Sequence, residues 1–533
     1  MIGEHPMSVA SDSHPVTTTE NRFSAEAAQP SSRRVRMIRI IAAVIAPVML
    51  AVALGTWALA SPVGSSPDED FHLNSIWCGN GIRQGLCEAG ATDQSRSVPS
   101  ALHESSHCFA GKPTQTPTCL LSPYEKFVDT TRGNFNNSNE VSGSGYPTLY
   151  YAVMGLIASK HVTTSVIVMR LLNVLIYVGL ITALGLLLSP ARRGILLWSI
   201  PITIVPFGMF LIPSINPSGW GLISASTLWL ALVGYFEADS TRRRIGFGAI
   251  ALAAYAIGVG ARADAGAYAV VAIVIAIILT AQRTRRFVLL SIPPLLSIIV
   301  AIVIFLQLGQ NDPTARGSEP RPNSEMFLNF FRLPELWAGS FGTWGLGWLD
   351  TTLPGTVWAL AFLVFAGMTF RAFGRFSRRT LLATLGTGFF LVAIPLAVLF
   401  RNHLLVGTLI QPRYLLPLLI ILAGVMLFSW TGESVGLSRA QIAVVVAMLA
   451  IANTVALHVN MRRYLTGTDT ISLNLNSQVE WWWAIPVSPL TVWVVGTLTF
   501  ALSLAAIATL AFTDRYRRVA PPQSQGLLSE QLR

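Results

Sequence analysis

The apolar run MIRIIAAVIAPVMLAVALGTWALA, residues 37–60, is followed at once by the polar segment SPVGSSPDEDFH, residues 61–72. A helix needs about 20 apolar residues to cross the hydrocarbon layer of a bilayer. Directly before the run, RRVR at 33–36 supplies three arginines, which favours a cytoplasmic start. The run is too long, and begins too late, for the apolar core of a cleaved signal peptide. It therefore predicts an uncleaved signal-anchor helix that delivers residues 61–72 to the outer face.

The composition of the whole chain agrees with a lipid environment. Of 533 residues, 52% are hydrophobic and only 12% are charged, whereas about a quarter of the residues of a soluble protein carry charge. The mean hydropathy is +0.55. These values exclude a soluble multidomain enzyme, a disordered scaffold and a fibrous protein. We expect an all-α integral membrane protein with a polytopic membrane domain over 33–513, a polar, disordered cytoplasmic tail over 1–32 and a second cytoplasmic tail over 514–533.

Eleven further apolar segments bring the expected number of transmembrane helices to about twelve. After 37–60 they are 168–188, 194–213, 218–236, 245–262, 265–281, 287–307, 354–370, 381–400, 414–430, 440–459 and 489–512. With a cytoplasmic N-terminus, clusters such as Arg242-Arg243-Arg244 all fall on the inner side, as the positive-inside rule requires. The net charge of +11 therefore reflects orientation in the membrane, and we expect no nucleic-acid partner.

Two of the expected outer segments are long, 61–167 and 308–353. Inside the first, YPTLYYAVMGLIASK at 146–160 is apolar but short for a span. We therefore expect an interfacial helix there, with its tyrosines at headgroup level.

All four cysteines lie in the first outer segment: Cys78, Cys87, Cys108 and Cys119. Confinement to the extracytoplasmic side favours two disulfides, which would hold a loop that lacks a large core of its own. The pairing Cys78–Cys87 with Cys108–Cys119 closes the shortest loops. Zinc is the alternative, since His103 and His107 lie nearby.

Three carboxylates follow the first span within one helical turn of the membrane: Asp68, Glu69 and Asp70. One interpretation is local, because Ser66 with Glu69 forms an S-x-x-E capping box and acids favour a helix N-terminus. The functional interpretation is that one carboxylate faces a cavity between loop and membrane and accepts a proton. Asp68 and His72 are four residues apart and share a face if the segment is helical. The catalytic candidates are Asp68, Glu69 and His72.

Several arginines lie at the outer ends of spans, where the charge rule predicts few cations. They are Arg170, Arg262, Arg401 and Arg413, the last of them beside Tyr414. At its depth Arg170 is costly unless it snorkels to the interface or faces a polar partner. Arg262 can instead pair locally with Asp264, and Arg413 can be a lone interfacial anchor. Together they indicate an outer face that binds an anion such as a phosphate.

The second outer segment contains WAGSFGTWGLGWLDTTLP, residues 337–354. Its tryptophans can sit at the interface, and its glycines permit tight turns. Trp344, Trp348 and Asp350 would also make a set for stacking on a sugar and hydrogen-bonding to it. The sequence has no P-loop, dinucleotide fingerprint, HExxH or nucleophile elbow, so we do not expect ATP-driven transport by this chain.

Five segments carry a resemblance to a known family. In chain order they are PDEDFH at 67–72, YPTLYY at 146–151, NPSGW at 216–220, FGTWGLGWLDTTLP at 341–354 and QPRYLLP at 411–417. They resemble the bacterial polytopic membrane family called domain of unknown function 2142, over roughly residues 40–460. The NPSG and GWLDT segments are the most specific. The insert at 78–119, which carries the four cysteines, departs from that pattern.

That family in turn resembles the GT-C superfamily of integral membrane glycosyltransferases, which take a sugar from a polyprenyl-phosphate carrier on the outer face. The resemblance implies an acidic residue early in the first outer segment that acts as a base or binds the acceptor. That residue maps to Asp68 or Glu69. The implied partners are the lipid bilayer, a polyprenyl-phosphate sugar donor and a cell-envelope glycan or glycoprotein acceptor, at the bacterial plasma membrane.

We therefore expect a membrane glycosyltransferase in which a carboxylate deprotonates the acceptor hydroxyl and outer arginines hold the departing lipid phosphate. No cofactor and no metal ligands are indicated, and a need for a divalent cation stays open. The alternative is a non-catalytic transporter or flippase of a lipid-linked glycan, or a silent partner of a transferase. Transporters place polar residues at the midplane in broken helices, whereas here the polar residues gather at the outer helix ends.

The arginine clusters generate a prediction about topology. Both termini should face the cytoplasm, and both long segments, 61–167 and 308–353, should lie outside. Single cysteines introduced for accessibility labelling should react with an impermeant reagent in the outer segments only. Labelling that places residues 61–140 in the cytoplasm would contradict this topology.

Overall fold

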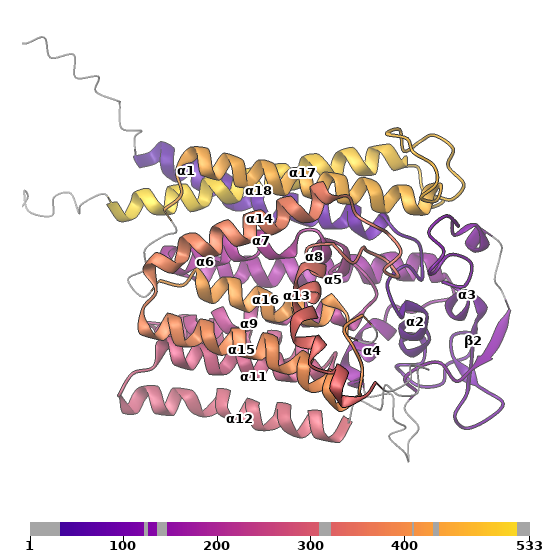
Figure 1. Ribbon diagram of the computed structural model, residues 1–533, viewed down its shortest axis with the longest axis horizontal. Helices are drawn as coiled ribbons and strands as arrows, with labels where there is room; N and C mark the ends of the chain where they lie inside the picture. The colour runs from indigo at the N-terminus through magenta and orange to yellow at the C-terminus, as the bar shows by residue number, and fades with distance from the viewer. Residues whose placement is uncertain are drawn as a thin grey trace, which may run out of the picture.

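The structure of the protein is a computed structural model, and it describes residues 32–121, 126–135, 146–308, 321–407, 410–429 and 436–519. Within these ranges, nine helices are long and apolar enough to cross a membrane. They are α1 (Ser32–Leu59), α5 (Val162–Leu187), α9 (Pro217–Glu237), α11 (Ala263–Thr280), α12 (Arg285–Leu308), α14 (Gly355–Ala372), α15 (Arg378–Arg401), α17 (Arg439–Leu465) and α18 (Pro489–Val519). Figure 1 shows them side by side, with their axes roughly along one direction. The expected helical membrane fold is therefore confirmed.

The three remaining expected spans differ from the nine. Two are single helices, α10 (Thr241–Val259) and the shorter α16 (Pro412–Met426). The expectation of one continuous helix over 194–213 is wrong, since this segment falls into α6 (Pro190–Ser199), α7 (Pro201–Ile204) and α8 (Phe207–Leu211). The prolines at 201 and 206 explain the breaks, because each lacks the N–H that would continue a helix. Before Pro206, Val205 is also extended, as is usual for a residue that precedes proline. Residues 198–234 are all buried, so the irregular backbone lies inside protein rather than against lipid.

The first outer segment folds into a small unit of its own at one end of the bundle (Figure 1). Its elements are α2 (Glu69–Trp77), β1 (Glu88–Ala89), β2 (Arg96–Pro99), α3 (Ser100–His103), the 3-10 helix η1 (Thr118–Leu121), β3 (Phe127–Thr130) and α4 (Thr148–Gly155). The strands form an antiparallel sheet in the order β1-β2-β3, with Val98 opposite Val128. The membrane part is thus helical as expected, and the outer unit adds a sheet.

Both expected disulfides are confirmed. Cys78 pairs with Cys87 and Cys108 with Cys119, so none of the four thiols is left for the zinc alternative. The second disulfide closes a loop that Arg463 of α17 holds, because its guanidinium donates to the carbonyls of Phe109 (2.7 Å) and Gln115 (2.6 Å). The outer unit is therefore fastened to the helical bundle as well as closed on itself.

The tyrosines of α4 point into the protein, so the expectation that they lie at headgroup level is wrong. Tyr150 and Tyr151 are buried, and α4 packs against α2. The ring of Tyr150 lies edge-on to Trp220 of α9, with the centroids 5.0 Å apart. Neighbouring aromatic rings offer these tyrosines better contacts than the interface would, and the helix extends over only eight residues.

The second outer segment contains one amphipathic helix and a set of turns. Its described elements are the 3-10 helix η3 (Asn323–Glu325) and α13 (Leu328–Gly339), while a further 3-10 helix, η4 (Phe373–Arg375), follows α14 at the other end of the bundle. In Figure 1, α13 crosses in front of the spans at a steep angle. After α13, Leu346 and Thr351 form an isolated antiparallel bridge. Positive φ angles at Gly342 and Gly345 permit the turns before the bridge, and that at Gly347 permits the turn within it.

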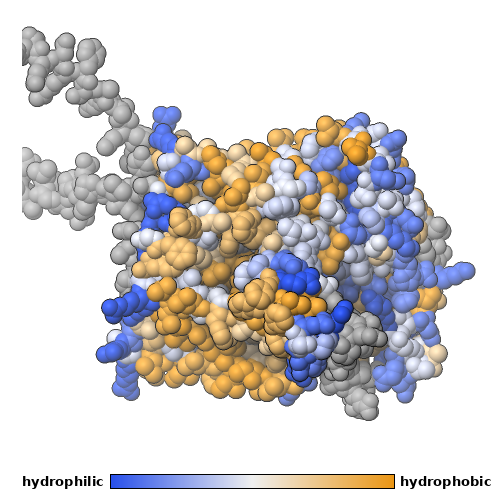
Figure 2. Space-filling model, in the orientation of Figure 1, coloured by the Kyte–Doolittle hydropathy of each residue, from blue (hydrophilic) through white to orange (hydrophobic). Residues whose placement is uncertain are grey.

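The distribution of buried and apolar surface agrees with a membrane setting. Helix α9 is central, because 94% of its apolar 18-residue stretch is buried inside the protein. Helix α12 is peripheral, because only 17% of the corresponding stretch is buried. Figure 2 shows hydrophobic surface along the middle of the bundle and hydrophilic surface at its two ends. An apolar band between two polar ends is what a bilayer requires of a protein that crosses it.

The expected tails fall largely outside the described residues. Residues 1–31 and 520–533 are not described, so the expectation of a disordered first tail lies outside the described residues. At the boundaries, α1 begins at Ser32 and α18 continues to Val519, past the expected end of the membrane domain at 513. The start of α1 and the end of α18 lie at the same end of the bundle (Figure 1).

The disulfide pairing can be tested on the purified protein. Mass spectrometry of peptides prepared without reductant should find Cys78 joined to Cys87 and Cys108 joined to Cys119, with no alkylated cysteine. Reduction before alkylation is the control, and it should expose all four thiols. Alkylation of all four without reductant would refute the disulfides.

Candidate functional site

Each of the three consecutive carboxylates at the start of α2 forms an ion pair with a different arginine. Asp68 pairs with Arg413 of α16, Glu69 with Arg170 of α5, and Asp70 with Arg132, two residues after β3. Asp68 has a left-handed backbone, with φ 61° and ψ 17°, a conformation that aspartate tolerates better than most residues. It stands as the N-cap, so that α2 begins only at Glu69. This turn directs neighbouring side chains toward three separate parts of the chain.

Glu69 and Arg170 form a buried ion pair. Arg170 Nη2 lies 3.1 Å from Glu69 Oε1, and neither side chain is more than 2% exposed. The same guanidinium donates to the carbonyl oxygens of Ser61 (2.6 Å) and Pro62 (2.7 Å). Arg170 therefore fastens the turn after α1 onto α5, and a buried polar partner explains how the span carries an arginine at that depth.

The capping box expected between Ser66 and Glu69 is only half formed. The backbone N–H of Ser66 donates to Glu69 Oε2 at 2.8 Å. The second bond of the box is missing, because Asp68 rather than Ser66 is the N-cap and the Ser66 hydroxyl is buried without a partner in the described part of the chain. Glu69 is thus held on one oxygen by Arg170 and on the other by this backbone amide.

Asp70 connects α2 to the outer unit through Arg132. The Arg132 guanidinium donates from Nε to Asp70 Oδ2 (3.0 Å) and from Nη2 to Oδ1 (3.1 Å), which is a bidentate contact. Burial alone would lower the pKa of Arg132, but the hydrogen bonds and charge of Asp70 raise it. Arg132 also reaches within 3.9 Å of Asp68 Oδ1. The sequence analysis missed this residue, and a lone arginine in a polar loop gives no signal that would find it.

Asp68 is the most accessible of the three carboxylates. Its side chain is 19% exposed, against 0% for Glu69 and 7% for Asp70. Arg413 Nη2 lies 2.8 Å from Asp68 Oδ2 and 3.0 Å from the Tyr414 hydroxyl. Asp68 therefore combines contact with a buried guanidinium and access from outside.

Two motif segments meet at the carbonyl oxygen of Pro67. Arg413 Nη1 donates to it at 3.2 Å, and Asn216 Nδ2 donates at 2.8 Å. Asn216 is the N-cap of α9, where its Oδ1 accepts the backbone N–H of Ser218. The NPSG and QPRY motifs thus fix the backbone immediately before Asp68. Asn216 was noted in the sequence only as part of the NPSG motif and not as a candidate site residue.

Arg262, the N-cap of α11, lies close to Tyr414 of α16. It pairs with Asp264 through two hydrogen bonds, of 2.7 and 2.9 Å, so the local ion pair does form. Its guanidinium carbon lies 4.8 Å from the centroid of the Tyr414 ring and 5.6 Å from that of Tyr146. The guanidinium carbon of Arg413 lies 5.1 Å from the Tyr414 centroid. Both arginines are therefore in cation–π range of one tyrosine.

His72 is buried beneath this cluster and is neutral. Its Nδ1 lies 3.0 Å from the Tyr151 hydroxyl. Burial lowers the pKa of His72 to about 3, and the nearby arginines at 132, 262 and 413 contribute in the same direction, while Asp68 opposes them. The imidazole therefore stays uncharged at any pH near neutrality, as a hydrogen-bonding group and not as an imidazolium.

The other candidate residues lie in different places. Trp348 Nε1 donates to the carbonyl of Gly64 at 2.8 Å, so it touches the turn that leads to Asp68. Asp350 pairs with Arg463 at 2.9 Å and accepts the backbone N–H of Gly111, which associates it with the Cys108–Cys119 loop. Arg401 ends α15 with an exposed side chain. No group of three His, Cys, Asp or Glu side chains converges as metal ligands do within the described ranges.

The fold and the site together define a polytopic α-helical membrane protein with an ion-paired acidic and basic cluster at one end of its bundle. The chain belongs to the family described as predicted membrane protein (DUF2142), which it matches over residues 39–422. The family resemblance of the sequence motifs is thereby confirmed. The match includes all three carboxylates and their arginine partners. No curated protein and no solved structure gives a significant match.

The ion pairs generate a prediction about stability. Glu69→Gln should lower stability by about 3–5 kcal/mol, because it leaves the Arg170 charge buried without a counter-charge. Asp68→Asn should cost clearly less, since its side chain is partly exposed and Arg413 keeps its bonds to Pro67 and Tyr414. Thermal unfolding in lipid nanodiscs would measure both.

The matched control is the double variant Glu69→Gln/Arg170→Gln, which removes both charges and should be more stable than either single variant. Equal losses of stability in Glu69→Gln and Asp68→Asn would contradict this distinction between the two carboxylates.

Proposed function

We propose that the protein is a membrane glycosyltransferase of the GT-C type, which transfers a sugar from a polyprenyl-phosphate carrier to a cell-envelope acceptor on the outer face. The observation that carries the proposal is the position of Asp68. It is the accessible carboxylate of the three, and two arginines, Arg413 at 2.8 Å and Arg132 at 3.9 Å, flank it. A base beside cations is the arrangement that sugar transfer from a phosphate carrier needs.

In the proposed step, an acceptor hydroxyl gives its proton to Asp68, and its oxygen forms a bond to the anomeric carbon of the sugar. The bond between that carbon and the phosphate oxygen breaks, and the electron pair leaves with the polyprenyl phosphate. Arg413 and Arg132 then stabilise the negative charge that develops on the leaving phosphate.

Arg413 has two alternative partners in this proposal, the Asp68 carboxylate and the donor phosphate. In the absence of donor, Arg413 Nη2 binds Asp68. A donor phosphate carries more charge and more acceptor oxygens than one carboxylate, so it competes for the guanidinium. Once Arg413 turns to the phosphate, Asp68 loses a strong ion-pair partner and becomes a better proton acceptor. Donor binding would in this way prepare the base.

Glu69 is the weaker catalytic candidate. Both of its carboxylate oxygens accept buried hydrogen bonds, one from Arg170 and one from the backbone N–H of Ser66. Its side chain is fully buried, and its removal would leave the buried Arg170 without a counter-charge. We therefore assign Glu69 the role of positioning Asp68.

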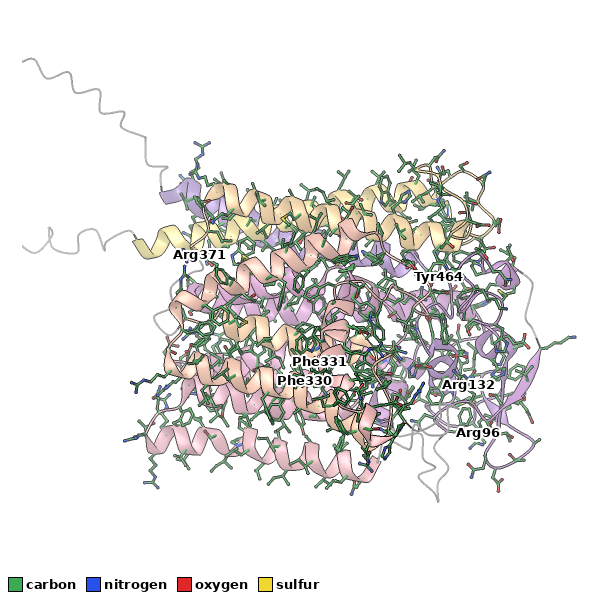
Figure 3. All side chains as sticks on the ribbon, in the orientation of Figure 1. Arg96, Arg132, Phe330, Phe331, Arg371 and Tyr464 are labelled. Atoms are coloured by element: carbon green, nitrogen blue, oxygen red, sulfur yellow. A yellow bond between two sulfur atoms is a disulfide. The ribbon has the colours of Figure 1, made fainter. Side chains whose placement is uncertain are left out.

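The helix α13 supports approach of a lipid-linked donor from the bilayer. Leu333 and Leu336 on one face are buried, whereas Phe330 and Phe331 are 61% and 72% exposed. Figure 3 labels these two phenylalanines. A third face carries the exposed ion pair of Arg332 and Glu335. Such a helix suits the boundary between hydrocarbon and headgroups.

The end of α13 also lies against the start of α16. The hydroxyl of Ser340 donates to the carbonyl of Pro412 at 3.3 Å, and a Cβ on Gly339 would clash with the Pro412 ring. Pro412 immediately precedes Arg413. A lipid chain along the phenylalanine face would therefore reach the arginine that is proposed to hold its phosphate.

One observation favours the alternative of a transporter or flippase. The segment over 194–213 is a broken helix inside the bundle, as transporters often have. Its short helices α7 and α8, however, present mostly aliphatic and aromatic side chains, including Ile202, Phe207 and Phe210. The charged groups gather instead around Asp68, which favours the transferase.

The first prediction of this proposal concerns the base. Asp68→Asn should lower transfer of a radiolabelled sugar from its polyprenyl phosphate by about 10²–10⁴-fold, because the amide cannot accept the proton. Expression and thermal stability should stay close to those of the parent protein. The matched control is Asp129→Asn, because Asp129 is an exposed carboxylate of the outer unit. This variant should transfer the sugar at the rate of the parent protein.

Complementation of a deletion strain would extend the test to the cell. Failure of Asp68→Asn to complement, with full complementation by Asp129→Asn, would support the transferase. Full complementation by Asp68→Asn and by Glu69→Gln, singly and together, would refute it and leave the transporter or the silent partner.

The second prediction concerns the phosphate. A charge-assisted hydrogen bond contributes about 1.5–3 kcal/mol. Arg413→Ala should therefore weaken the binding of polyprenyl phosphate that carries no sugar roughly ten- to hundredfold. Arg413→Lys should restore part of the affinity, because lysine keeps the charge but lacks the planar fork. Unchanged affinity in a folded Arg413→Ala protein would remove this residue from the site.

A further inference from the structure

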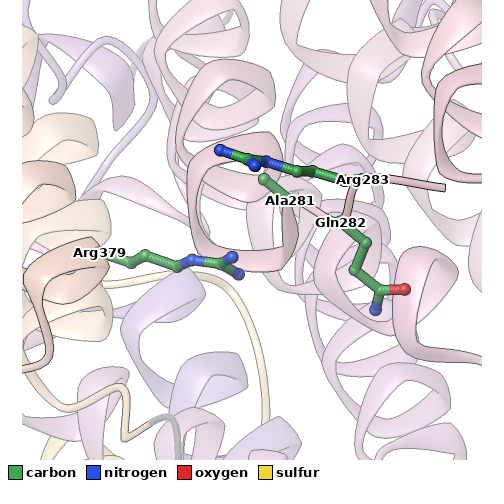
Figure 4. A pocket seen from close by; sticks show the side chains of 4 residues that line it. All are labelled: Ala281, Gln282, Arg283 and Arg379. Carbon is green, nitrogen blue, oxygen red and sulfur yellow. The ribbon is translucent and has the colours of Figure 1, made fainter.

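Two arginines from different parts of the chain line one cavity at the end of the bundle opposite the outer site. The cavity has a volume of approximately 480 Å³, and its lining residues are Ala281, Gln282, Arg283 and Arg379. Residues 281–283 form the link between α11 and α12, and Arg379 is the second residue of α15. Figure 4 shows both guanidinium groups in the space between this link and the start of α15.

The charges around the cavity favour an anion. Among the residues that the structure describes, its lining contains two guanidinium groups and no carboxylate. The start of α15 lies beside it, and the N-terminus of a helix of 24 residues carries a partial positive charge that adds to those of the arginines. An anion in the cavity would face both guanidinium groups, since both line the same space.

The surroundings of the cavity favour a lipid as the source of that anion. The two helices that begin beside the cavity are peripheral. Only 17% of the apolar 18-residue stretch of α12 and 22% of that of α15 is buried inside the protein. Exposed leucines follow within two turns, Leu289 on α12 and Leu382 and Leu385 on α15. Acyl chains packed against these faces would bring their headgroups to the level of the arginines.

We propose that this cavity binds the phosphate of an anionic phospholipid headgroup in the leaflet at the arginine-rich end of the bundle. Arg283 and Arg379 each donate to the phosphate oxygens, and the lipid chains lie on the exposed faces of α12 and α15. The volume is in the range of small-ligand sites. A lipid in this position bridges the α11–α12 link and the start of α15. This site is independent of the proposed transfer reaction.

Native mass spectrometry of the full chain can test the site. Protein released from nanodiscs that contain phosphatidylglycerol and phosphatidylcholine should retain phosphatidylglycerol selectively. Arg283→Gln/Arg379→Gln should weaken that retention at least about tenfold, since each guanidinium supplies charge-assisted hydrogen bonds. Arg378→Gln is the matched control, because Arg378 is the exposed neighbour of Arg379 and does not line the cavity. It should retain the lipid normally.

Two further arms separate the outcomes. Arg283→Lys/Arg379→Lys keeps both charges and should retain phosphatidylglycerol better than the glutamine variant, which rules out misfolding as the cause of the loss. Inorganic phosphate and glycerol 3-phosphate, added at millimolar concentration, should not displace the lipid. Equal loss in the Arg378→Gln protein, or no preference for phosphatidylglycerol in the parent protein, would overturn the site. Displacement by inorganic phosphate alone would overturn the assignment to a lipid.

Discussion

Three successive carboxylates bind three arginines that come from separate parts of the chain, and the outer end of the molecule depends on this constraint. Glu69 holds Arg170 of α5, Asp70 holds Arg132 after β3, and Asp68 holds Arg413 of α16. The left-handed turn at Asp68 makes the three directions compatible. Because removal of one partner from a buried ion pair is costly, the two more deeply buried carboxylates fix the spans and the outer unit around the third. Asp68 remains the carboxylate that a ligand can reach.

The membrane explains why the charges gather where they do. Inside hydrocarbon a charged side chain needs a partner or a route to water, and Arg170 meets this need by binding Glu69 and the carbonyls of the turn after α1. The charged side chain of Arg413, at the start of α16, and the polar side chain of Asn216, at the start of α9, both donate to the carbonyl oxygen of Pro67. Helix starts thus deliver polar groups to one boundary. In the proposed reaction a lipid-linked donor would present its phosphate at this same boundary, so the structural and the proposed catalytic roles share a location.

The helical membrane fold, the pairing of the cysteines and the family were predictable from the sequence, because they depend on local properties: hydropathy over about 20 residues, short loop closures and motif order. The break at Pro201 and Pro206 was missed because its residues are as apolar as a span. Arg132 was missed because its partner, Asp70, is 62 residues away. Asp68 and Glu69 looked alike in the sequence, and only the fold separates them, since burial depends on which long-range arginine each one meets. The tyrosines of α4 were misplaced for the same reason, as their partners lie on α2 and α9.

In the proposed reaction, Arg413 exchanges Asp68 for the donor phosphate. A cryo-electron microscopy structure of the protein in nanodiscs with polyprenyl phosphate would test this exchange. We expect phosphate density within hydrogen-bond distance of the Arg413 guanidinium, with the Asp68 carboxylate released from its 2.8 Å contact and open to the outer side. Lipid phosphate bound elsewhere, with the Asp68–Arg413 pair intact, would contradict it.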